Sequence, residues 1–317
     1  IMNSEFAIET QELSKRYEGD VLAVNGVDLA IPTNSIYALL GPNGAGKTTT
    51  VSMLTTLIKP TGGTAQVAGF DVTQQAGEVR ARIGVTFQEI VLDPDLTGQE
   101  SLDFHGRLYN FPRSQREAKI AELLSLVELE EAADRRTNTY SGGMKRRLEL
   151  ARGLMTDPEV LFLDEPTQGL DPQNRANIWD YIRNLQANTN ITLLLTTHYM
   201  DEAEALADIV GIIDNGTLVA EGTPQEFIRQ MGADVFQIEG SGNRGAFVER
   251  LEQLPFVQAI NTSNGTMQIS AGEGGGRLVE IVQASQDAAF RIEDVSIAKP
   301  TLGDVFLKYT GRQLRDK

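Results

Sequence analysis

The sequence contains no cysteine, a single tryptophan and comparatively little positive charge. Without cysteine the chain can form neither disulfide bonds nor thiolate zinc sites, which suits a reducing compartment. Lysine and arginine number 28 against 44 aspartate and glutamate residues, so the net charge is −16. Because nucleic acids and anionic lipid surfaces are also negative, this charge argues against non-specific binding to either. We therefore expect no nucleic-acid partner, and partners recognised by local sites.

Long apolar segments are also missing. A helix needs about 18 apolar residues to span a bilayer, and the longest candidates are short, such as residues 191–195. Residues 2–6 lack the basic start and the apolar core of a secretory signal, so we expect none. The 317 residues suffice for one large α/β domain and a smaller one. We predict a cytoplasmic protein with domains at 5–228 and 229–317.

A glycine-rich segment, GPNGAGKTT, follows the apolar run at residues 36–40. An apolar strand, a glycine turn and the start of a helix, here predicted over residues 49–57, match the P-loop pattern GxxxxGK[ST]. The glycines let backbone N–H groups surround an anion, Lys47 can neutralise the β- and γ-phosphates, and Thr48 offers a hydroxyl to Mg²⁺. The segment predicts a nucleotide-phosphate site made of Gly41, Pro42, Asn43, Gly44, Ala45, Gly46, Lys47, Thr48 and Thr49.

Two side chains outside this segment are ambiguous. Tyr17 lies in a polar turn between two predicted strands. Its ring either packs in a small satellite core or stacks on a base. Gln88 ends a short predicted strand at residues 84–88, after a predicted helix at 79–83. It is either a ligand of Mg²⁺ or water, or an ordinary polar residue at a strand end.

Helical periodicity dominates residues 97–127 and predicts a helical insertion over about residues 89–155. His105 lies within it, where we expect a surface or packing role. Further along, Ser141 is placed to cap a helix, and Gly142-Gly143 leaves the N–H groups of its first turn accessible. This helix start is either only a capped terminus or a second anion site. The P-loop and the Ser141 helix start would then be two phosphate-binding ends for one nucleotide. Such a pair would suit a composite site that another copy of the chain completes.

Acidic and imidazole side chains follow two predicted buried strands. Asp164 and Glu165 come directly after the apolar run at residues 160–163. Paired carboxylates at such a position are costly unless they hold a cation or a proton. Asp164 fits a ligand of Mg²⁺ through water, and Glu165 fits the base that takes a proton from the attacking water. His198 ends the run that starts at residue 191 and is placed to donate to a γ-phosphate.

The order and the intervals of these motifs resemble the nucleotide-binding domain of an ATP-binding cassette (ABC) ATPase, over about residues 5–225. The resemblance implies an α/β P-loop fold with an inserted helical subdomain, and ATP and Mg²⁺ as cofactors. It implies that Tyr17 stacks on adenine, that Gln88 is the Q-loop glutamine, that Asp171 is the D-loop aspartate and that His198 is the H-loop histidine. It further implies a homodimer or pseudo-dimer, with each ATP held between the P-loop of one copy and the Ser141 helix of the other.

Departures from the common motifs narrow the subgroup. The signature here is YSGGM, in which Tyr140 and Met144 stand where many members have leucine and glutamine. This variant resembles the antibiotic-resistance exporters of the daunorubicin type. Their ATPases often end in an acidic Leu-Asp-Glu-Val-Phe-Leu-like motif, and this chain has Leu-Gly-Asp-Val-Phe-Leu with Gly303 in place of one acid. We count Met144 among the nucleotide-binding residues with Ser141, Gly142 and Gly143.

A second unit follows residue 229, with a predicted β-α-β-β-α-β order typical of a ferredoxin-like module. Asn264-Gly265 is expected to turn its central pair of strands. The glycine-rich residues 272–276 are expected to form a loop and not a second P-loop, because no Lys-Ser/Thr follows. Regulation, dimerisation and bracing of the ATPase are equally open as roles for this accessory α+β domain.

The expected function is that of the ATP-hydrolysing subunit of a multi-subunit drug, antibiotic or lipid-like exporter. An integral membrane permease would dock at the helical insertion and hold the protein at the cytoplasmic face of the membrane. Two alternatives are a soluble ABC ATPase outside transport and a nucleotide-dependent regulatory switch. The single cassette and the negative charge disfavour the first, and Glu165 disfavours the second, because a pure switch needs no catalytic base.

Overall fold

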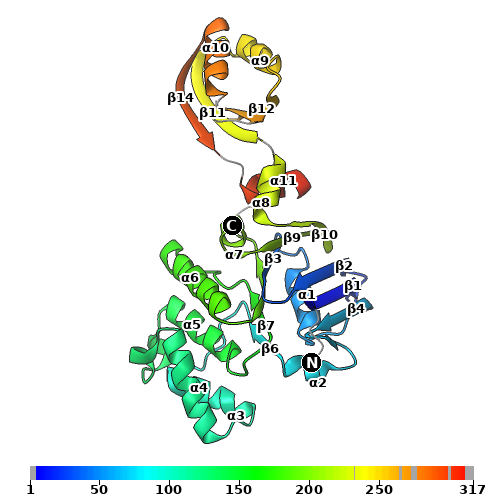
Figure 1. The fold of residues 1–317 in the computed structure, drawn as a ribbon, viewed down its shortest axis with the longest axis vertical. Coiled ribbons are helices and arrows are strands. Elements are labelled where there is room, and N and C mark those ends of the chain that lie inside the picture. The colour runs from blue at the N-terminus through cyan, green and yellow to red at the C-terminus, as the bar shows by residue number, and fades with distance from the viewer. Residues whose placement is uncertain (1–4, 232, 264–265, 273–276, 299–300, 311–317) are drawn as a thin grey trace. The chain divides into compact units, whose positions relative to one another are not determined.

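A computed structural model describes residues 5–231, 233–263, 266–272, 277–298 and 301–310 (Figure 1). The chain divides into two compact units, residues 1–223 and 224–317. This division precedes the expected boundary at residue 228, which falls within the helix α8 (Pro224–Met231). The described part of the chain holds no helix that is both long and apolar enough to cross a bilayer.

The first unit is built on a six-stranded sheet in the order β10-β9-β3-β8-β7-β6. Strands β3, β6, β7, β8 and β9 are parallel, and β10 pairs with β9 in antiparallel fashion. Strands β3, β7 and β8 are buried along their whole length, which agrees with the apolar runs IYALL, VLFL and LLL within them. The bounds are β3 Ile36–Leu40, β6 Ile83–Thr86, β7 Val160–Asp164, β8 Thr192–Thr197, β9 Ile209–Asp214 and β10 Thr217–Gly222.

An antiparallel sheet, β2-β1-β4-β5, and helix α1 share one hydrophobic core with the six-stranded sheet. This core includes Leu13, Val51 and Phe162, all of them buried. The bounds are β1 Phe6–Arg16, β2 Leu22–Pro32, α1 Lys47–Leu54, β4 Gly62–Val67 and β5 Phe70–Asp71. The prediction of a helix at 79–83 is wrong in its second half. Helix α2 (Ala76–Arg80) ends at Arg80, because Ile83 already pairs with Val160 in β6.

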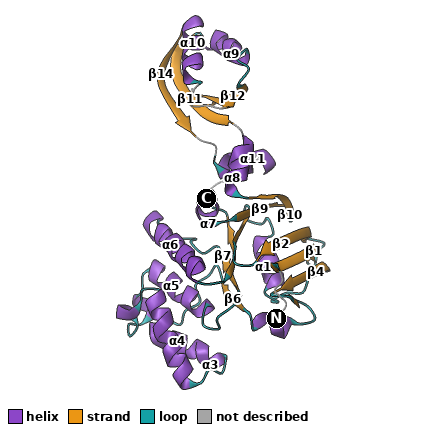
Figure 2. Ribbon diagram, in the orientation of Figure 1, coloured by secondary structure: helices purple, strands orange, loops and turns teal. Residues whose placement is uncertain are grey.

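Helices α3 to α5 lie together at one end of the first unit (Figure 2). A capping box between Thr97 and Glu100 starts α3, as the acidic residue in its first turn favours. The helices predicted over 97–127 are present as α3 and α4. The bounds are α3 Gly98–Leu108, α4 Arg113–Leu126, α5 Gly142–Gly153, α6 Pro172–Asn188 and α7 Met200–Leu206, with short 3₁₀ turns at Glu130–Ala132 and Thr137–Thr139.

The second unit contains an antiparallel sheet in the order β12-β13-β11-β14. Helices α9 and α10 cover this sheet, and its core includes Phe236 and the stacked rings of Phe247 and Phe290. The expected turn at 264–265 and residues 273–276 of the expected glycine-rich loop lie outside the described residues. The bounds are β11 Ala233–Gly242, α9 Arg244–Glu252, β12 Val257–Ser263, β13 Thr266–Gly272, α10 Leu278–Asp287, β14 Phe290–Ala298 and α11 Leu302–Thr310.

Candidate functional site

The glycine-rich segment forms a turn between β3 and α1 that only glycine permits. Gly44 and Gly46 have φ values of 82° and 106°. A Cβ atom on Gly46 would lie 2.5 Å from the carbonyl oxygen of Ala23 in β2. Gly46 also directly precedes α1, so the N–H groups of the first helical turn are available to an anion. The segment therefore has the backbone of a phosphate cradle.

The turn between β9 and β10 closes on this cradle from the side. Asn215 and Gly216 have positive φ values, as the Asn-Gly hairpin signal predicts. The Gly216 N–H donates to the Ala45 carbonyl at 2.9 Å, and the Asn25 N–H donates to the Gly216 carbonyl at 2.8 Å. The P-loop backbone is thus fixed by β2 and by a distant hairpin as well as by its own helix.

Lys47 is buried, with only 4% of its surface exposed. Its Nζ donates to the carbonyl oxygens of Gly41 and Pro42 at 2.7 and 3.2 Å, and lies 3.3 Å from Glu165 Oε1. Burial lowers the pKa of Lys47, while the carboxylates of Glu165 and Asp164 oppose that effect. The ammonium group lies at the mouth of the glycine turn, where it can meet phosphate oxygens.

Oxygen atoms converge where β7 ends. Asp164 Oδ1 accepts hydrogen bonds from the hydroxyls of Thr48 at 3.3 Å and Thr196 at 2.5 Å. Carboxylate and hydroxyl oxygens are hard ligands of the kind that Mg²⁺ prefers. Thr48 and Asp164 therefore offer oxygen ligands that fit a divalent cation bound together with phosphates.

Glu165 adopts an uncommon backbone conformation, with φ 49°. Its N–H donates to the carbonyl and the hydroxyl of Thr196, at 3.2 and 3.0 Å. Its Oε2 lies 3.1 Å from His198 Nδ1, but the two atoms are not aligned for a hydrogen bond, and each is buried without another partner among the described residues. Two such atoms at the same place suit a site in which an incoming group supplies the missing hydrogen bonds.

The charge state of Glu165 follows from its neighbours. Burial raises the pKa of this carboxyl group, but the contacts with His198 and Lys47 outweigh burial, so the pKa lies below its usual range. Glu165 is therefore ionised at neutral pH, as a proton acceptor must be. The structure thus brings together the predicted residues Lys47, Thr48, Asp164, Glu165 and His198.

Gln88 lies two residues beyond the end of β6, and not within a strand that extends to residue 88 as predicted. Its Nε2 donates to Gln168 Oε1 at 2.6 Å. Gln168 belongs to the loop that follows Glu165. Gln88 is therefore tied to the loop beside the carboxylates through a residue 80 positions away in sequence.

The predicted second anion site lies elsewhere in the unit. Ser141 caps α5, with its hydroxyl accepting from the Met144 N–H at 3.2 Å. Asp171 caps α6 in the same way, and a Cβ atom on Gly143 would lie 2.8 Å from Asn174 Oδ1 in that helix. Figure 1 shows α5 and α1 apart from each other, with β7 between them in this view. The chain therefore does not bring the Ser141 end of α5 to its own P-loop.

Tyr17 follows the end of β1 and is 42% exposed, so it is not a buried core residue. The ammonium group of Lys15 lies 5.3 Å from the centre of its ring. Tyr17 joins β1 to β2, the strand whose Ala23 lies against Gly46. Its ring is thus accessible on the hairpin that borders the P-loop.

Arg146 is a residue that the sequence analysis did not single out. It is 2% exposed, and it donates to the backbone carbonyls of Phe87 and of residues 164–166. The sequence did contain a signal that this position faces the interior. Buried residues of α5 recur at helical spacing, at Gly143, Arg146, Leu150 and Gly153. Only the folded arrangement shows what the guanidinium binds.

The parallel sheet, the glycine turn before α1 and the paired carboxylates after β7 define a P-loop nucleoside triphosphatase. A family model described as ABC transporter matches residues 24–168. The daunorubicin resistance ATP-binding protein of Streptomyces coeruleorubidus is 41% identical over 98% of both chains. A Nod factor export ATP-binding protein of Paraburkholderia xenovorans is also 41% identical, over 98% of this chain and 99% of that protein.

Solved structures agree with this relationship. CbiO1 of Clostridium perfringens, part of the ABC transporter complex cbiONQ, superimposes with a TM-score of 0.67 and 26% identity, over 72% of this chain and 95% of that one. A dimeric ATP-binding cassette bound to ADP and Pi gives a TM-score of 0.61 and 25% identity, over 68% and 98%. The chain belongs to the ABC transporter ATP-binding proteins, in the subgroup of the daunorubicin- and doxorubicin-resistance type. It is an ATPase.

Proposed function

We propose that the protein is the ATP-hydrolysing subunit of a membrane exporter for a drug, an antibiotic or a lipid-like substrate. Relatives named for daunorubicin resistance, for linearmycin resistance and for Nod factor export support this class of cargo. The observation that carries the proposal is the cluster of Lys47, Glu165 and His198, in which Glu165 Oε2 and His198 Nδ1 are buried without a hydrogen-bond partner in the part of the chain that the structure describes.

Each residue of the cluster has a role in hydrolysis. The P-loop N–H groups and Lys47 bind the β- and γ-phosphates, Glu165 takes the proton from the attacking water, and His198 donates to the transferring phosphoryl group. Thr48, Asp164 and Gln88 would hold Mg²⁺, which supplies charge neutralisation at the phosphates when bound. Tyr17 offers its exposed ring to the adenine.

The remaining predicted residues serve a second copy of the chain. Ser141, Gly142, Gly143 and Met144 open α5 with accessible N–H groups, yet α5 lies away from α1 of the same chain. We infer a head-to-tail dimer, in which this helix start and Asp171 complete the nucleotide site of the other copy. The dimeric cassette among the solved structures supports this arrangement.

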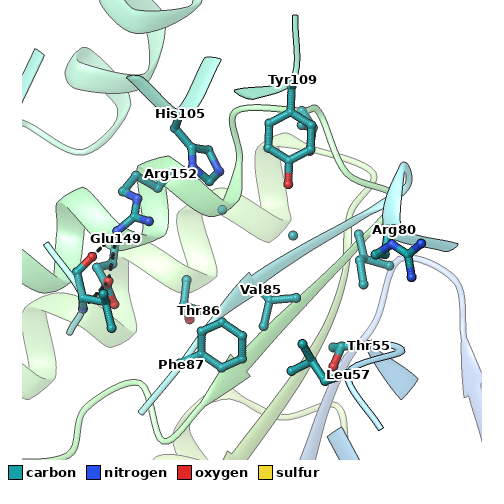
Figure 3. A pocket seen from close by; sticks show the side chains of 15 residues that line it. Thr55, Leu57, Arg80, Val85, Thr86, Phe87, His105, Tyr109, Glu149 and Arg152 are labelled. Carbon is teal, nitrogen blue, oxygen red and sulfur yellow. Dashed lines mark hydrogen bonds and ion pairs between the residues drawn. The ribbon is translucent and has the colours of Figure 1, made fainter. Parts of the chain in front are cut away.

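The helical subdomain, about residues 89–155, is the proposed docking region for an integral membrane permease. Between it and β6 lies a pocket of about 390 Å³ (Figure 3). Leu57, Val85, Phe87 and Tyr109 supply apolar walls, and Arg80 supplies positive charge. Arg152 also lines the pocket, but it lies 3.4 Å from the carboxylate of Glu149, another lining residue. The lining suits a short amphipathic segment of the permease that carries an acidic residue. Docking there would hold the protein at the cytoplasmic face of the membrane.

His105 forms part of this pocket. Its ring contacts Tyr109 edge to face, with the ring centres 5.2 Å apart. Burial lowers the pKa of His105 to about 4, with help from the nearby Arg152. The imidazole is therefore neutral at physiological pH. This agrees with a packing role in the docking surface and not with a role in proton transfer.

For residues 224–317 we propose an accessory α+β domain of ferredoxin-like type. Its elements follow the order β-α-β-β-α-β from β11 to β14, and the sheet order β12-β13-β11-β14 is that of a split βαβ unit. Regulation, dimerisation and bracing of the ATPase all remain compatible with this fold.

The test of the proposed function is ATP turnover and oligomeric state of the native protein and of Glu165→Gln, with and without ATP and Mg²⁺. We expect the variant to lose at least about 100-fold in kcat and to accumulate as an ATP-bound dimer, because the base is removed while binding is kept. Glu204→Gln, at an exposed position in α7, is the matched control and should behave as native. A variant that hydrolyses ATP normally would refute the assignment of the base.

A further inference from the structure

All N–H groups of the Arg146 guanidinium are engaged. Nε donates to the Pro166 carbonyl at 2.6 Å, and Nη2 donates to the carbonyls of Asp164 and Glu165 at 3.1 and 2.9 Å. Nη1 donates to the Phe87 carbonyl at 2.6 Å and lies 3.5 Å from Glu149 Oε2. A guanidinium has five N–H donors, and Arg146 makes five hydrogen bonds.

These acceptors belong to the ends of two neighbouring strands. Phe87 directly follows β6, and residues 164–166 form the exit from β7. Carbonyl groups at strand ends lack partners in the sheet, and buried carbonyls are costly when they are unpaired. Arg146 donates to four of them from a third element, α5, and among these the Glu165 carbonyl also accepts from the Gln168 N–H at 3.2 Å. A lysine, with a compact ammonium group, cannot reproduce this forked set of bonds.

The backbone that Arg146 holds is the backbone that aims Glu165. Glu165 sits at φ 49°, a conformation that persists only where surrounding contacts enforce it. Thr196 binds its N–H from one side, and Arg146 binds its carbonyl from the other. Without Arg146 the Glu165 carbonyl would retain the Gln168 N–H, but the contacts with the Asp164 and Pro166 carbonyls on either side would be lost. The peptide could then rotate and turn the carboxylate away from Lys47 and His198.

We propose that Arg146 is a positioning residue for ATP hydrolysis, which fixes the Asp164–Pro166 backbone so that the Glu165 carboxylate faces the phosphate site. Arg146 does so from α5, whose Ser141 end serves the nucleotide of the other copy. Arg146 therefore links the Glu165 base of one nucleotide site to α5, the helix whose Ser141 end completes the nucleotide site of the other copy. This inference rests on the proposed role of Glu165.

The test compares Arg146→Lys and Arg146→Gln with the native full-length protein. We expect kcat to fall about 10- to 100-fold, as for other small misplacements of catalytic groups. We expect KM and the affinity for a fluorescent ATP analogue to stay near their native values, whereas the melting temperature should fall because buried carbonyls lose a donor. Gln carries no charge, so it avoids burying an unmatched ammonium group. Arg147→Lys, the next residue of α5, is the matched control and should keep native turnover.

Other outcomes would overturn the proposal. If both variants retain kcat within twofold, Arg146 does not position the base. If activity, nucleotide affinity and the folded fraction fall together in both variants, Arg146 is only structural. Glu165→Gln measured in parallel separates this inference from the proposed function. An inactive Glu165→Gln with native-like Arg146 variants refutes the inference alone, whereas an active Glu165→Gln refutes both.

Discussion

The pKa values of Lys47 and Glu165 reflect different balances between burial and the groups beside them. Burial dominates for Lys47 and lowers its pKa, whereas for Glu165 the contacts with His198 and Lys47 outweigh burial and lower its pKa. The two groups lie close together, with Lys47 Nζ 3.3 Å from Glu165 Oε1. An incoming phosphate would compete with Glu165 for the ammonium group of Lys47 and release the carboxylate toward water.

The glycine at position 46 gives a test at the scale of one residue. Gly46→Ala places a Cβ atom against the Ala23 carbonyl at a φ that L-residues avoid. We expect the affinity for a fluorescent ATP analogue to fall at least about tenfold, because the cradle must deform. The control is Gly77→Ala in α2, where a Cβ meets nothing within 4 Å. It should leave nucleotide affinity unchanged, and equal affinities in the two variants would contradict the steric argument.

At the scale of elements, the pocket between β6 and the helices α3 to α5 is the clearest candidate for contact with another protein. Leu57 and Tyr109 are exposed apolar residues on its wall. We expect Leu57→Asp and Tyr109→Asp to reduce retention of the protein on inverted membrane vesicles from host cells by about tenfold. The apolar contact would be lost and an acidic segment repelled.

Val279→Asp provides the matched control for the docking variants. Val279 is also exposed and apolar, but it belongs to α10 in the second unit. It should leave vesicle retention unchanged. Melting temperatures near the native value would show that all three variants are folded. Normal retention of both pocket variants would argue against docking at this pocket.

The sequence predicted the elements whose signals are local. The P-loop turn and the cap at Ser141 each depend on a few neighbouring residues, and both are present. Contacts between distant segments could not be predicted in this way. The bond from Gln88 to Gln168 and the carbonyl contacts of Arg146 exist only because β6, β7 and α5 meet in space.

At the scale of the whole molecule, the two units have separate hydrophobic cores. Phe247→Ala removes a fully buried ring from the second core, which should cost about 3–5 kcal/mol. We expect calorimetry to show one transition shifted down and the other unchanged. ATP with Mg²⁺ should raise only the unshifted transition, because the nucleotide residues all lie in the first unit.

The converse experiment uses Phe162→Ala, which removes a buried ring from the hydrophobic core of the first unit. It should shift the transition that responds to ATP and leave the other in place. A single cooperative transition that moves in both variants would mean that the units do not unfold independently.

The hairpin turn that closes on the P-loop also bears on how the protein is made. Ribosomes deliver the chain from its N-terminus at about 5–20 residues per second. The GPNGAGKTT segment is synthesised early, yet Ala45 acquires its bond to Gly216 only after β7, β8 and β9 have been added. A nascent chain that ends before this turn contains the whole GPNGAGKTT segment but lacks the hydrogen bond from the Gly216 N–H to the Ala45 carbonyl. The capacity to hold ATP is therefore acquired late in translation of the first unit.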